Sequence, residues 1–326
     1  MRTVHLTVAI PSYQRRASLL RLIGTLAPEI SRVRSVGGEV GVVAVIDGST
    51  DGSAEALKEL RTPFDLDVRW QENRGLAAAR NVGLAAAADG LVLFFDDDLV
   101  PTRGLLARHF LAHQTGLPHV LLGPCRPIAS AGHSAYWLSW WEEHYRELAR
   151  SGKVERFDQF TVANASGPAD IFAGAGGFDE TFVTYGGEDY ELGVRLLGRG
   201  VLVRYDDDVV AIHDHQEDDF TAIARQRSIG RNSVLLVQRH PGLEAEVFPL
   251  RPRSRAVRLV AAVPGRSPFA FRALAATMAP LALSHPWALA GWAHMAYEIA
   301  HAASFAAGVA EADPRYLSRF LDGRAV

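Results

Sequence analysis

The sequence predicts an α/β protein with a mostly parallel central sheet and a helical region after it. Three segments carry this prediction, because each combines a short apolar run, a polar turn and a helical stretch in that order. Their apolar runs are Leu6–Ile10, Val42–Ile46 and Leu66–Trp70. Strands that alternate with helices form βαβ units, whose strands lie parallel in one sheet.

The first two segments are the clearest. Leu6–Ile10 runs into the polar turn Pro11–Arg15, and a helix is expected from about Ser18. Val42–Ile46 runs into Asp47–Ser53, a turn made of Gly, Ser, Thr and Asp, before the next helix. Aliphatic runs bounded by such turn residues are typical of buried strands. We therefore expect both runs to be strands of the sheet.

The third segment leads to the most informative feature of the chain. Leu66–Trp70 is a weaker strand candidate, and Asn73–Gly75 and the Ala-rich stretch Leu76–Ala88 follow it. The apolar run Leu91–Phe95 comes next and ends at three carboxylates, Asp96–Asp98. Adjacent like charges repel unless a cation lies among them, and hard oxygen ligands suit Mg²⁺ or Mn²⁺. The triplet thus predicts a divalent metal that carries a phosphate group, with a solvated acidic loop as the alternative.

Several polar residues stand just after predicted strands or in the helix that follows. They are Tyr13, Asp47, Arg80 and the triplet Asp96–Asp98. In sheets of this kind, ligands bind beyond the carboxyl ends of the strands. We therefore expect these residues to converge on one crevice, although they are far apart in sequence.

Composition limits the class of protein. The 326 residues suffice for one large catalytic domain and an added module. The formal net charge of −3 gives no reason to expect nucleic acid as a partner. The single cysteine, Cys125, excludes an intrachain disulfide and suits a reducing compartment. No apolar signal segment precedes the first strand, so we expect a cytoplasmic protein.

Six motifs follow one another along residues 4–215. They are Ala9–Arg15, Ile46–Gly52, Asn73–Asn81, Asp96–Asp98, Gly176–Glu180 and Glu188–Leu192. Each is weak alone, but in this order they make the chain resemble the family 2 glycosyltransferases of the GT-A fold, which has a Rossmann-like sheet flanked by helices. One departure is Ile46–Asp47, where many relatives have two acidic residues.

The resemblance implies a nucleotide-diphosphate sugar donor, a divalent cation (Mn²⁺ or Mg²⁺) and inversion at the anomeric carbon. It implies that Asp98 coordinates the metal and that Asp96 faces the ribose and metal-bound water. His213 would complete the metal shell, with His215 in reserve, and an ordinary strand-end histidine is the alternative. Asp97 either joins the donor site or points away from it.

The resemblance also assigns the donor site. Asp47 would accept a hydrogen bond from the base, and Tyr13 would stack on that base, unless it is an ordinary strand-end aromatic. Arg80 would reach the ribose or the phosphates, which arginine can bind bidentately. Arg15 is a second candidate for that contact, with a solvated side chain as the alternative. The remaining motif residues assigned to nucleotide-sugar binding are Pro11 and Gly75.

Inversion needs a carboxylate that takes the proton of the acceptor hydroxyl as the hydroxyl attacks. The resemblance assigns this role to Asp189, and Glu188 would orient the acceptor or the loop. Acidic residues at the start of a helix are otherwise ordinary, because the helix dipole favours them. In the same helix, Glu191 and Arg195 have the spacing of a simple surface ion pair.

Two further segments are assigned to the acceptor side. Gly176 and Gly177 belong to a loop whose small residues let backbone approach the sugar, and Asp179 would cap this loop or bind a hydroxyl. The aromatic stretch Tyr136–Tyr145 has helical spacing and is expected to be mainly core. Trp140 is its candidate for a contact in the acceptor groove.

The C-terminal third allows two interpretations. Ala273–Tyr297 contains no charged residue, but prolines and histidines interrupt it. The arginines that precede it are Arg251, Arg253, Arg255 and Arg258. A helical accessory module is the first interpretation. A basic and apolar surface at the inner face of an anionic membrane is the second, and it would point to a lipid-linked acceptor.

We therefore expect a catalytic domain over residues 1–218, with a nucleotide-binding half at 1–115 and an acceptor half at 116–218, and a helical region over 219–326. The expected activity is sugar transfer from a nucleotide donor to a hydroxyl of a saccharide, a lipid-linked molecule or a small molecule. UDP is favoured by family frequency, and GDP and dTDP stay open. The alternatives are a nucleotidyltransferase, which would need a Gly-rich basic loop after the first strand, and a non-catalytic nucleotide-sugar-binding scaffold.

Overall fold

The structure is a computed structural model that describes residues 5–87, 90–128, 135–214, 219–248, 255–263, 266–283 and 290–322. The chain forms two compact units. The first unit comprises Met1–Ala129, Trp137–Val183 and Glu188–His215. The second unit comprises Ser130–Tyr136, Thr184–Gly187 and Gln216–Val326, so a four-residue piece of the middle of the chain groups with the C-terminal helices.

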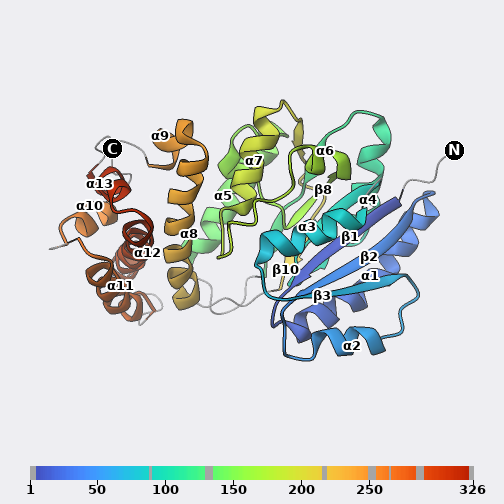
Figure 1. Cartoon of the computed structure of the whole chain (residues 1–326), viewed down its shortest axis with the longest axis horizontal. Helices are drawn as coiled ribbons and strands as arrows, with labels where there is room; N and C mark the ends of the chain where they lie inside the picture. The colour runs from blue at the N-terminus through green and yellow to red at the C-terminus, as the bar shows by residue number, and fades with distance from the viewer. Residues whose placement is uncertain are drawn as a thin grey trace. The chain divides into compact units, whose positions relative to one another are not determined.

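A seven-stranded sheet forms the centre of the first unit (Figure 1). Its strands, in spatial order, are β3 (Leu66–Gln71), β2 (Glu39–Asp47), β1 (His5–Ser12), β4 (Leu91–Phe95), β8 (Asn164–Pro168), β6 (Val120–Leu122) and β9 (Val203–Tyr205). The first four are parallel, whereas β8 runs antiparallel to both β4 and β6. The predicted α/β fold with a mostly parallel sheet is confirmed.

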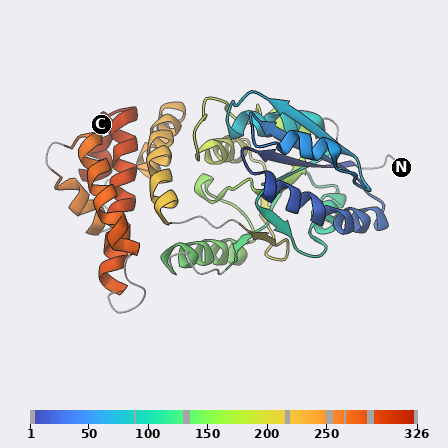
Figure 2. The ribbon, with the colours of Figure 1, turned by 90° about the horizontal axis from the view of Figure 1, so that it is seen from below.

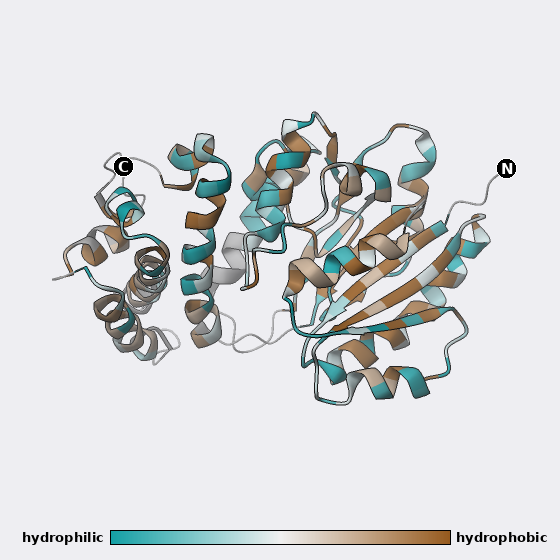
Figure 3. Cartoon of the chain, in the orientation of Figure 1, coloured by the Kyte–Doolittle hydropathy of each residue, from teal (hydrophilic) through white to brown (hydrophobic). Residues whose placement is uncertain are grey.

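Helices cover both faces of this sheet, because successive side chains of a strand point to opposite faces. On β1, Leu6, Val8 and Ile10 pack with the buried face of α1 (Arg16–Ser35). Ala9 points the other way and packs in the cluster that includes residues of α3 (Leu76–Ala87). Figure 2 shows α1 and α3 on opposite sides of the strands. These strands are mostly hydrophobic along their length (Figure 3).

The Ala-rich composition of α3 has a packing reason. A Cβ placed on Gly83 would lie 2.7 Å from the Cβ of Ala9, so this helix lies very close to β1. Ala77, Ala78 and Ala79 are also buried. Small side chains allow this close approach, which brings the first turn of α3 to the carboxyl ends of the strands.

A second, three-stranded sheet brings a late part of the chain back to the acidic triplet. Its strands are β5 (Leu99–Pro101), β10 (Ala211–His213) and β7 (Cys125–Pro127), in the order β5-β10-β7. His213 pairs with Leu99 in the antiparallel register of β10 and β5. The residue that precedes Leu99 is Asp98, so this register places His213 beside the end of the triplet.

The remaining elements of the first unit are helical. They are α2 (Ser53–Glu59), α4 (Leu105–Ala112), α5 (Ala135–Ser151, whose first two residues belong to the second unit), α6 (Ala169–Gly174), α7 (Glu188–Gly198) and the 3₁₀ turns His113–Thr115 and Phe157–Gln159. The aromatic stretch predicted to be helical lies in α5. Trp141 packs against the core and stacks on Tyr145, with ring centroids 5.4 Å apart. The side chains of Trp137 and Trp140 lie outside the described residues.

The second unit is helical. Its helices are α8 (Asp219–Arg239), α9 (Glu244–Val247), α10 (Arg255–Ala261), α11 (Pro268–Leu283), α12 (Ala290–Ala312) and α13 (Arg315–Asp322), with a 3₁₀ turn at Pro241–Leu243. The predicted C-terminal helices are therefore confirmed. Among the described residues, no helix is both long enough and apolar enough to cross a membrane. Arg251 and Arg253, on which the membrane-surface interpretation partly rests, lie outside the described residues.

Two glycines let α8 and α12 cross at close range. A Cβ on Gly230 of α8 would lie 2.2 Å from the carbonyl oxygen of Phe305, and a Cβ on Gly308 of α12 would lie 1.9 Å from that of Arg227. Glu311 of α12 accepts hydrogen bonds from Arg227 and Arg231 of α8, at 2.8 Å each. Backbone contact and charge pairing thus fix α8 against α12 within this unit.

Candidate functional site

The carboxyl ends of β1, β2 and β4 meet, as expected for parallel strands. Ser12 of β1 pairs with Ile46 of β2 in the sheet register. The hydroxyl of Ser12 donates a 2.6 Å hydrogen bond to the carboxylate of Asp97, just beyond β4. The ends of these three strands, which the sequence analysis placed in one crevice, are therefore adjacent.

Gln14 fastens the loop after β1 to the loop after β2. Its backbone N–H donates to the hydroxyl of Ser49 at 2.8 Å, and its side-chain amide donates to that of Thr50 at 3.1 Å. Gln14 has a φ of 54°, a left-handed conformation that is uncommon for a residue other than glycine. These bonds hold the backbone of the residue next to Arg15 in this conformation. Sequence reasoning did not single out Gln14, because a glutamine in a turn carries no distinctive pattern.

Asp98 lies between the side chains of Arg15 and His213. The guanidinium of Arg15 donates to its carboxylate, and Nε2 of His213 lies 3.3 Å from the same oxygen. Burial by itself would raise the pKa of Asp98, but His213 and Arg15 outweigh it and hold that pKa well below its usual value. Burial would likewise lower the pKa of His213, yet Asp98 raises it. Asp98 is therefore an anion that already attracts cations.

Asp97 faces the interior instead. It is only 6% exposed, and its carboxylate accepts the hydrogen bond from Ser12. Burial raises its pKa to about 7, against the lowering effects of Ser12 and Arg15. Both interpretations of Asp97, in the donor site or away from it, remain predictions.

Arg80 connects two parts of the site. It is 3% exposed, and its guanidinium donates to Glu188 at 2.8 Å and to Asp96 at 3.1 Å. Its carbon Cζ also lies 5.7 Å from the centroid of the Phe178 ring. The structure thus directs this arginine to two carboxylates, and its contact with a ribose or phosphate remains a prediction.

Asp189 begins α7 next to Glu188. Burial raises the pKa of Asp189 well above that of an ordinary aspartate, and the charge of Glu188 raises it further, while Arg80 lowers it. The carboxylate accepts a 2.9 Å hydrogen bond from the backbone N–H of Tyr190. A carboxylate whose pKa is raised in this way can accept a proton near neutral pH.

Asp47 has internal partners on both oxygens. One oxygen accepts from the amide of Gln71 at 2.7 Å and from the backbone N–H of Arg74 at 2.9 Å, and the other accepts from the N–H of Gly75 at 2.9 Å. Gly75 has a φ of 90°, which favours glycine. Asp47 therefore shapes the turn before α3, and a further hydrogen bond to a base remains a prediction.

The glycine loop after α6 is clamped from two sides. Asn81 of α3 accepts from the N–H of Phe178 at 2.8 Å and donates to the carbonyl of Phe178 at 2.9 Å. Arg195 of α7 donates to the carbonyl oxygens of Ala175 and Gly177. Asn81 closes the predicted motif Asn73–Asn81, which was the signal that could have revealed this contact. Gly176 and Gly177 have φ values of 97° and 69°, so the loop needs glycine at both positions.

The predicted ion pair between Glu191 and Arg195 is present, with Arg195 Nε 2.8 Å from Glu191, but its expected surface position is wrong. Glu191 is 3% exposed. Asp179 bonds locally to the N–H and hydroxyl of Thr181, at 2.9 and 2.7 Å, which is the capping role expected for it. The ring of Tyr13 is half exposed.

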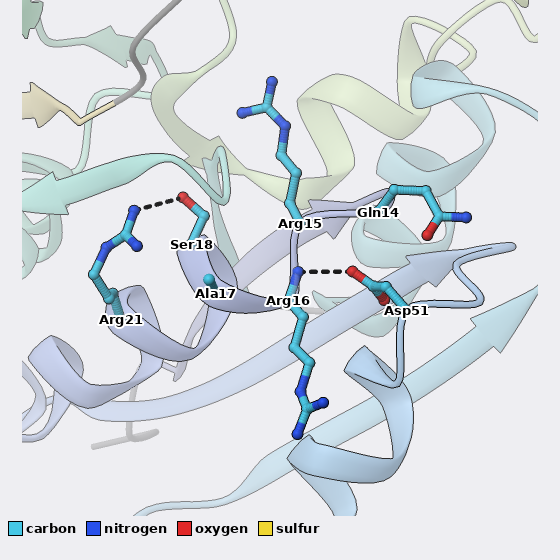
Figure 4. A pocket seen from close by; sticks show the side chains of 7 residues that line it. All are labelled: Gln14, Arg15, Arg16, Ala17, Ser18, Arg21 and Asp51. Atoms are coloured by element: carbon cyan, nitrogen blue, oxygen red, sulfur yellow. Dashed lines mark hydrogen bonds between the residues drawn. The ribbon is translucent and has the colours of Figure 1, made fainter.

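A pocket of about 410 Å³ opens at the start of α1 (Figure 4). Its lining consists of Gln14, Arg15, Arg16, Ala17, Ser18, Arg21 and Asp51. Arg15 and Arg16 point in opposite directions in this view, and the backbone N–H of Arg16 donates to Asp51 at 2.8 Å. Three of the lining residues are arginines, and one of them, Arg15, also donates to Asp98.

The residues assigned to a metal have suitable donor chemistry. Asp96 and Asp98 offer carboxylate oxygens and His213 offers an imidazole nitrogen, a set that suits Mn²⁺ or Mg²⁺. Asp98 and His213 are already side by side, with Nε2 of His213 3.3 Å from the Asp98 carboxylate. Within the described part of the chain, no three His, Cys, Asp or Glu side chains already converge as a closed metal site. His215, the reserve ligand, lies outside the described residues.

Comparisons with known proteins agree with this architecture. The model of the family "Glycosyl transferase family 2" matches residues 7–172. Over 270 residues the chain is 30% identical to validoxylamine A glucosyltransferase of Streptomyces hygroscopicus subsp. jinggangensis, covering 74% of this chain and 63% of that protein. It is also 30% identical over 246 residues to pre-mycofactocin glycosyltransferase of Mycobacterium tuberculosis, covering 72% and 48%. The chain thus spans less than two thirds of the length of these curated relatives.

Solved structures show the same fold. The mannosyltransferase PcManGT from Pyrobaculum calidifontis, in complex with GDP-Man and Mn²⁺, matches with a TM-score of 0.61 and 22% identity, over 93% of this chain and 87% of that chain. S. aureus TarS 1–349 in complex with UDP matches with a TM-score of 0.53 and 17% identity, over 96% and 92%. The fold is therefore GT-A, and the chain belongs to glycosyl transferase family 2.

Proposed function

We propose that this chain is a metal-dependent, inverting glycosyltransferase that moves a sugar from a nucleotide-diphosphate donor to an acceptor hydroxyl, with Asp189 as the base. The observation that carries the proposal is the line of side chains from Asp96 through Arg80 to Glu188, with hydrogen bonds of 3.1 and 2.8 Å. This line joins the acidic triplet, where a donor diphosphate would bind, to the start of α7, where Asp189 stands.

The reaction forms one bond and breaks one bond at the anomeric carbon. The acceptor oxygen attacks this carbon, and the bond between the carbon and the diphosphate oxygen breaks with its electron pair going to the leaving nucleotide diphosphate. Asp189 takes the proton of the acceptor hydroxyl on the side opposite the leaving group. Its raised pKa strengthens it as a base. Glu188 beside it forms a buried ion pair with Arg80, at 2.8 Å.

The cation would be held by Asp98 and Asp96, with His213 as a third ligand. When bound, Mn²⁺ or Mg²⁺ supplies Lewis-acid neutralisation of the charge that develops on the diphosphate. Arg15 reaches Asp98 and lines the arginine pocket, so its guanidinium can turn from the carboxylate to the diphosphate. Tyr13, half exposed in the neighbouring loop, is free on one side to flank the base.

The nucleotide and the sugar are proposed only as classes. The neighbouring structures hold GDP-Man, UDP or UDP-GlcNAc, which makes UDP- and GDP-sugars the first donors to test. Validoxylamine A glucosyltransferase is one relative, and a chondroitin synthase of Escherichia coli, 26% identical over 266 residues, is another, so a small molecule and a saccharide are the acceptor classes to test.

Calorimetric titration with UDP, GDP and dTDP, each with and without Mn²⁺, tests the donor half of the proposal. We expect one nucleotide to bind in a Mn²⁺-dependent manner and to lose at least tenfold in affinity in Asp98→Ala, about 1.4 kcal/mol. Asp208→Ala, which removes an exposed carboxylate paired with Arg108, is the matched control and should bind as the wild type does. A folded wild type that binds none of the three would overturn the proposal.

Asp189→Asn tests the catalytic half. The substitution keeps size and hydrogen bonding but removes the base, so nucleotide binding should persist while sugar transfer falls by about 10²–10⁴-fold. Transfer at the wild-type rate would remove Asp189 from its role and leave the donor assignment intact.

A further inference from the structure

The side-chain amide of Asn232, in the second unit, forms hydrogen bonds to three successive backbone carbonyl groups. Asn232 of α8 is 4% exposed. Its side-chain NH₂ donates to the carbonyl oxygens of Thr184 at 3.1 Å, Tyr185 at 3.3 Å and Gly186. Its side-chain oxygen accepts a 3.2 Å hydrogen bond from the hydroxyl of Thr184. All these residues belong to the same compact unit.

The segment Thr184–Gly187 belongs to no helix or strand. Gly186 and Gly187 have φ values of 85° and 99°, a region that leaves glycine backbone free to move. A Cβ on Gly186 would lie 3.1 Å from Cγ1 of Ile229, so the segment rests directly on α8. The guanidinium of Arg225, one turn earlier on α8, lies 4.3 Å from the centroid of the Tyr185 ring. Three side chains of α8 thus contact three consecutive loop residues.

The segment Thr184–Gly187 immediately precedes α7. Gly187 is followed directly by Glu188 and Asp189, the first residues of α7. The orientation of these two carboxylates depends on the backbone from which the helix starts. Two consecutive glycines before α7 would leave the first residues of this helix variable in position, because glycine loses the most conformational freedom on ordering.

We propose that Asn232 is a positioning residue for the Glu188–Asp189 pair, because it fixes the three carbonyls of the segment that leads into α7. The inference rests on the proposed function in that it takes Asp189 as the base. Asn232 touches neither donor nor acceptor in this account. It acts through the backbone, and the C-terminal helices thereby contribute to catalysis rather than only to the stability of their own unit.

The geometry favours an amide at this position over other residue types. An aspartate of the same size would put a carboxylate oxygen in place of the NH₂ group, facing three carbonyl oxygens that repel it, and an alanine would remove the amide that donates to these carbonyls. Asn232→Asp and Asn232→Ala therefore both remove the clamp, which is the set of hydrogen bonds from Asn232 to the three carbonyls. Asn232→Asp keeps the packing of the side chain, whereas Asn232→Ala does not.

Hydrogen exchange of the full-length protein tests the clamp without any substrate. In both variants, we expect peptides that cover 184–193 to exchange at least tenfold faster than in the wild type, while peptides of β1, β4 and α12 stay unchanged. Gln238→Ala, an exposed change on the same helix, is the matched control and should leave the whole pattern unchanged. Unchanged exchange over 184–193 in a folded Asn232 variant would overturn the inference whatever the activity of the enzyme.

Measuring turnover then distinguishes a positioning role of Asn232 from a purely stabilising role. UDP-GlcNAc and GDP-mannose serve as donor probes, and nucleotide release is measured well below the melting temperature of each variant. We expect kcat to fall about tenfold or more, while the Mn²⁺-dependent nucleotide Kd stays within twofold of the wild-type value, because small misplacements of a catalytic group cost rate. A lower melting temperature with wild-type kcat would assign Asn232 a stabilising role only and overturn the inference. Absence of nucleotide binding by the wild type would instead reject the proposed function, and the exchange result would still decide the clamp.

Discussion

Arg80 and Glu188, 108 positions apart in sequence, form a hydrogen-bonded ion pair with 2.8 Å between Nη1 and Oε1. Both residues are buried, at 3% and 4% exposure. The same guanidinium reaches Asp96 at 3.1 Å. A single side chain from α3 therefore sets the distance between the acidic triplet and the start of α7. Without it, two carboxylates would face each other in a poorly hydrated region.

Removal of Arg80 should be costly. Arg80→Ala leaves the buried Glu188 without its counter-charge, and breaking a buried pair in this way costs about 3–5 kcal/mol. Urea unfolding followed by circular dichroism measures the loss. Arg74→Ala breaks the exposed pair between Arg74 and Glu180 and should cost less than about 1 kcal/mol. Equal losses in the two variants would show that the buried pair is no more important than the surface one.

The pH profile of transfer should report the pair Glu188–Asp189. Burial and the charge of Glu188 raise the pKa of Asp189, and a base works only when deprotonated, so kcat/KM should rise with pH well above the range of an ordinary aspartate. Glu188→Gln removes the negative charge that raises the pKa of Asp189, whereas the positive charge of Arg80, which lowers this pKa, remains. The acidic limb should therefore move to lower pH in that variant. An unchanged acidic limb in Glu188→Gln would show that the pH profile does not report the titration of Asp189.

Arg15 should compete with the metal. Its guanidinium bonds to Asp98, so a cation that binds this carboxylate must displace it. Arg15→Ala should therefore tighten Mn²⁺ binding, measured by calorimetry without nucleotide, by about tenfold, which corresponds to about 1.4 kcal/mol. Arg21→Ala, which removes the exposed partner of Asp214, is the control and should leave Mn²⁺ affinity unchanged. Weaker Mn²⁺ binding in Arg15→Ala would mean that Arg15 supports the site rather than blocks it.

Much of the fold follows from local pattern. Leu6–Ile10 and Val42–Ile46 are continuous aliphatic runs, and their turn residues specify where each strand ends. Because parallel strands end at one edge of the sheet, the adjacency of the ends of β1, β2 and β4 could be predicted from the pattern alone. The helical C-terminal region could also be predicted, since its sequence offers no alternation of the strand type.

The partners of the site residues could not be predicted in the same way. Spacing of four places Glu191 beside Arg195 on a helix, but it does not reveal that loop residues cover this face and bury the pair. Asp97 and Asp98 are neighbours in sequence and both lie near the guanidinium of Arg15, yet only Asp97 accepts a hydrogen bond from Ser12 and only Asp98 lies beside His213. Asn232 stands in the middle of a helix, where its contact with Thr184–Gly186 depends entirely on tertiary packing. Such contacts join segments that no local pattern connects.

A buried histidine cluster behind β8 should make the stability of the fold depend on pH. His109 has no exposed surface, its Nδ1 lies 2.7 Å from the hydroxyl oxygen of Ser166, and its Nε2 lies 2.9 Å from the side-chain oxygen of Asn164. The same hydroxyl lies 2.8 Å from Nε2 of His113. Burial lowers the pKa of His109 to about 4 and that of His113 to about 3. Both rings are therefore neutral in the folded protein.

The sign of the effect follows from linkage. An unfolded histidine has a pKa of about 6.5, so below that value the unfolded chain binds protons that folded His109 does not. The free energy of unfolding should therefore have its full value above pH 6.5 and decrease as the pH drops toward 4. His109 alone should account for a decrease of about 2 kcal/mol at pH 5. Urea unfolding at pH 7.5 and pH 5.0 measures this difference. His109→Gln has no proton to bind there and should lose distinctly less stability between the two pH values. An equal loss in wild type and variant would place the acid sensitivity elsewhere in the chain.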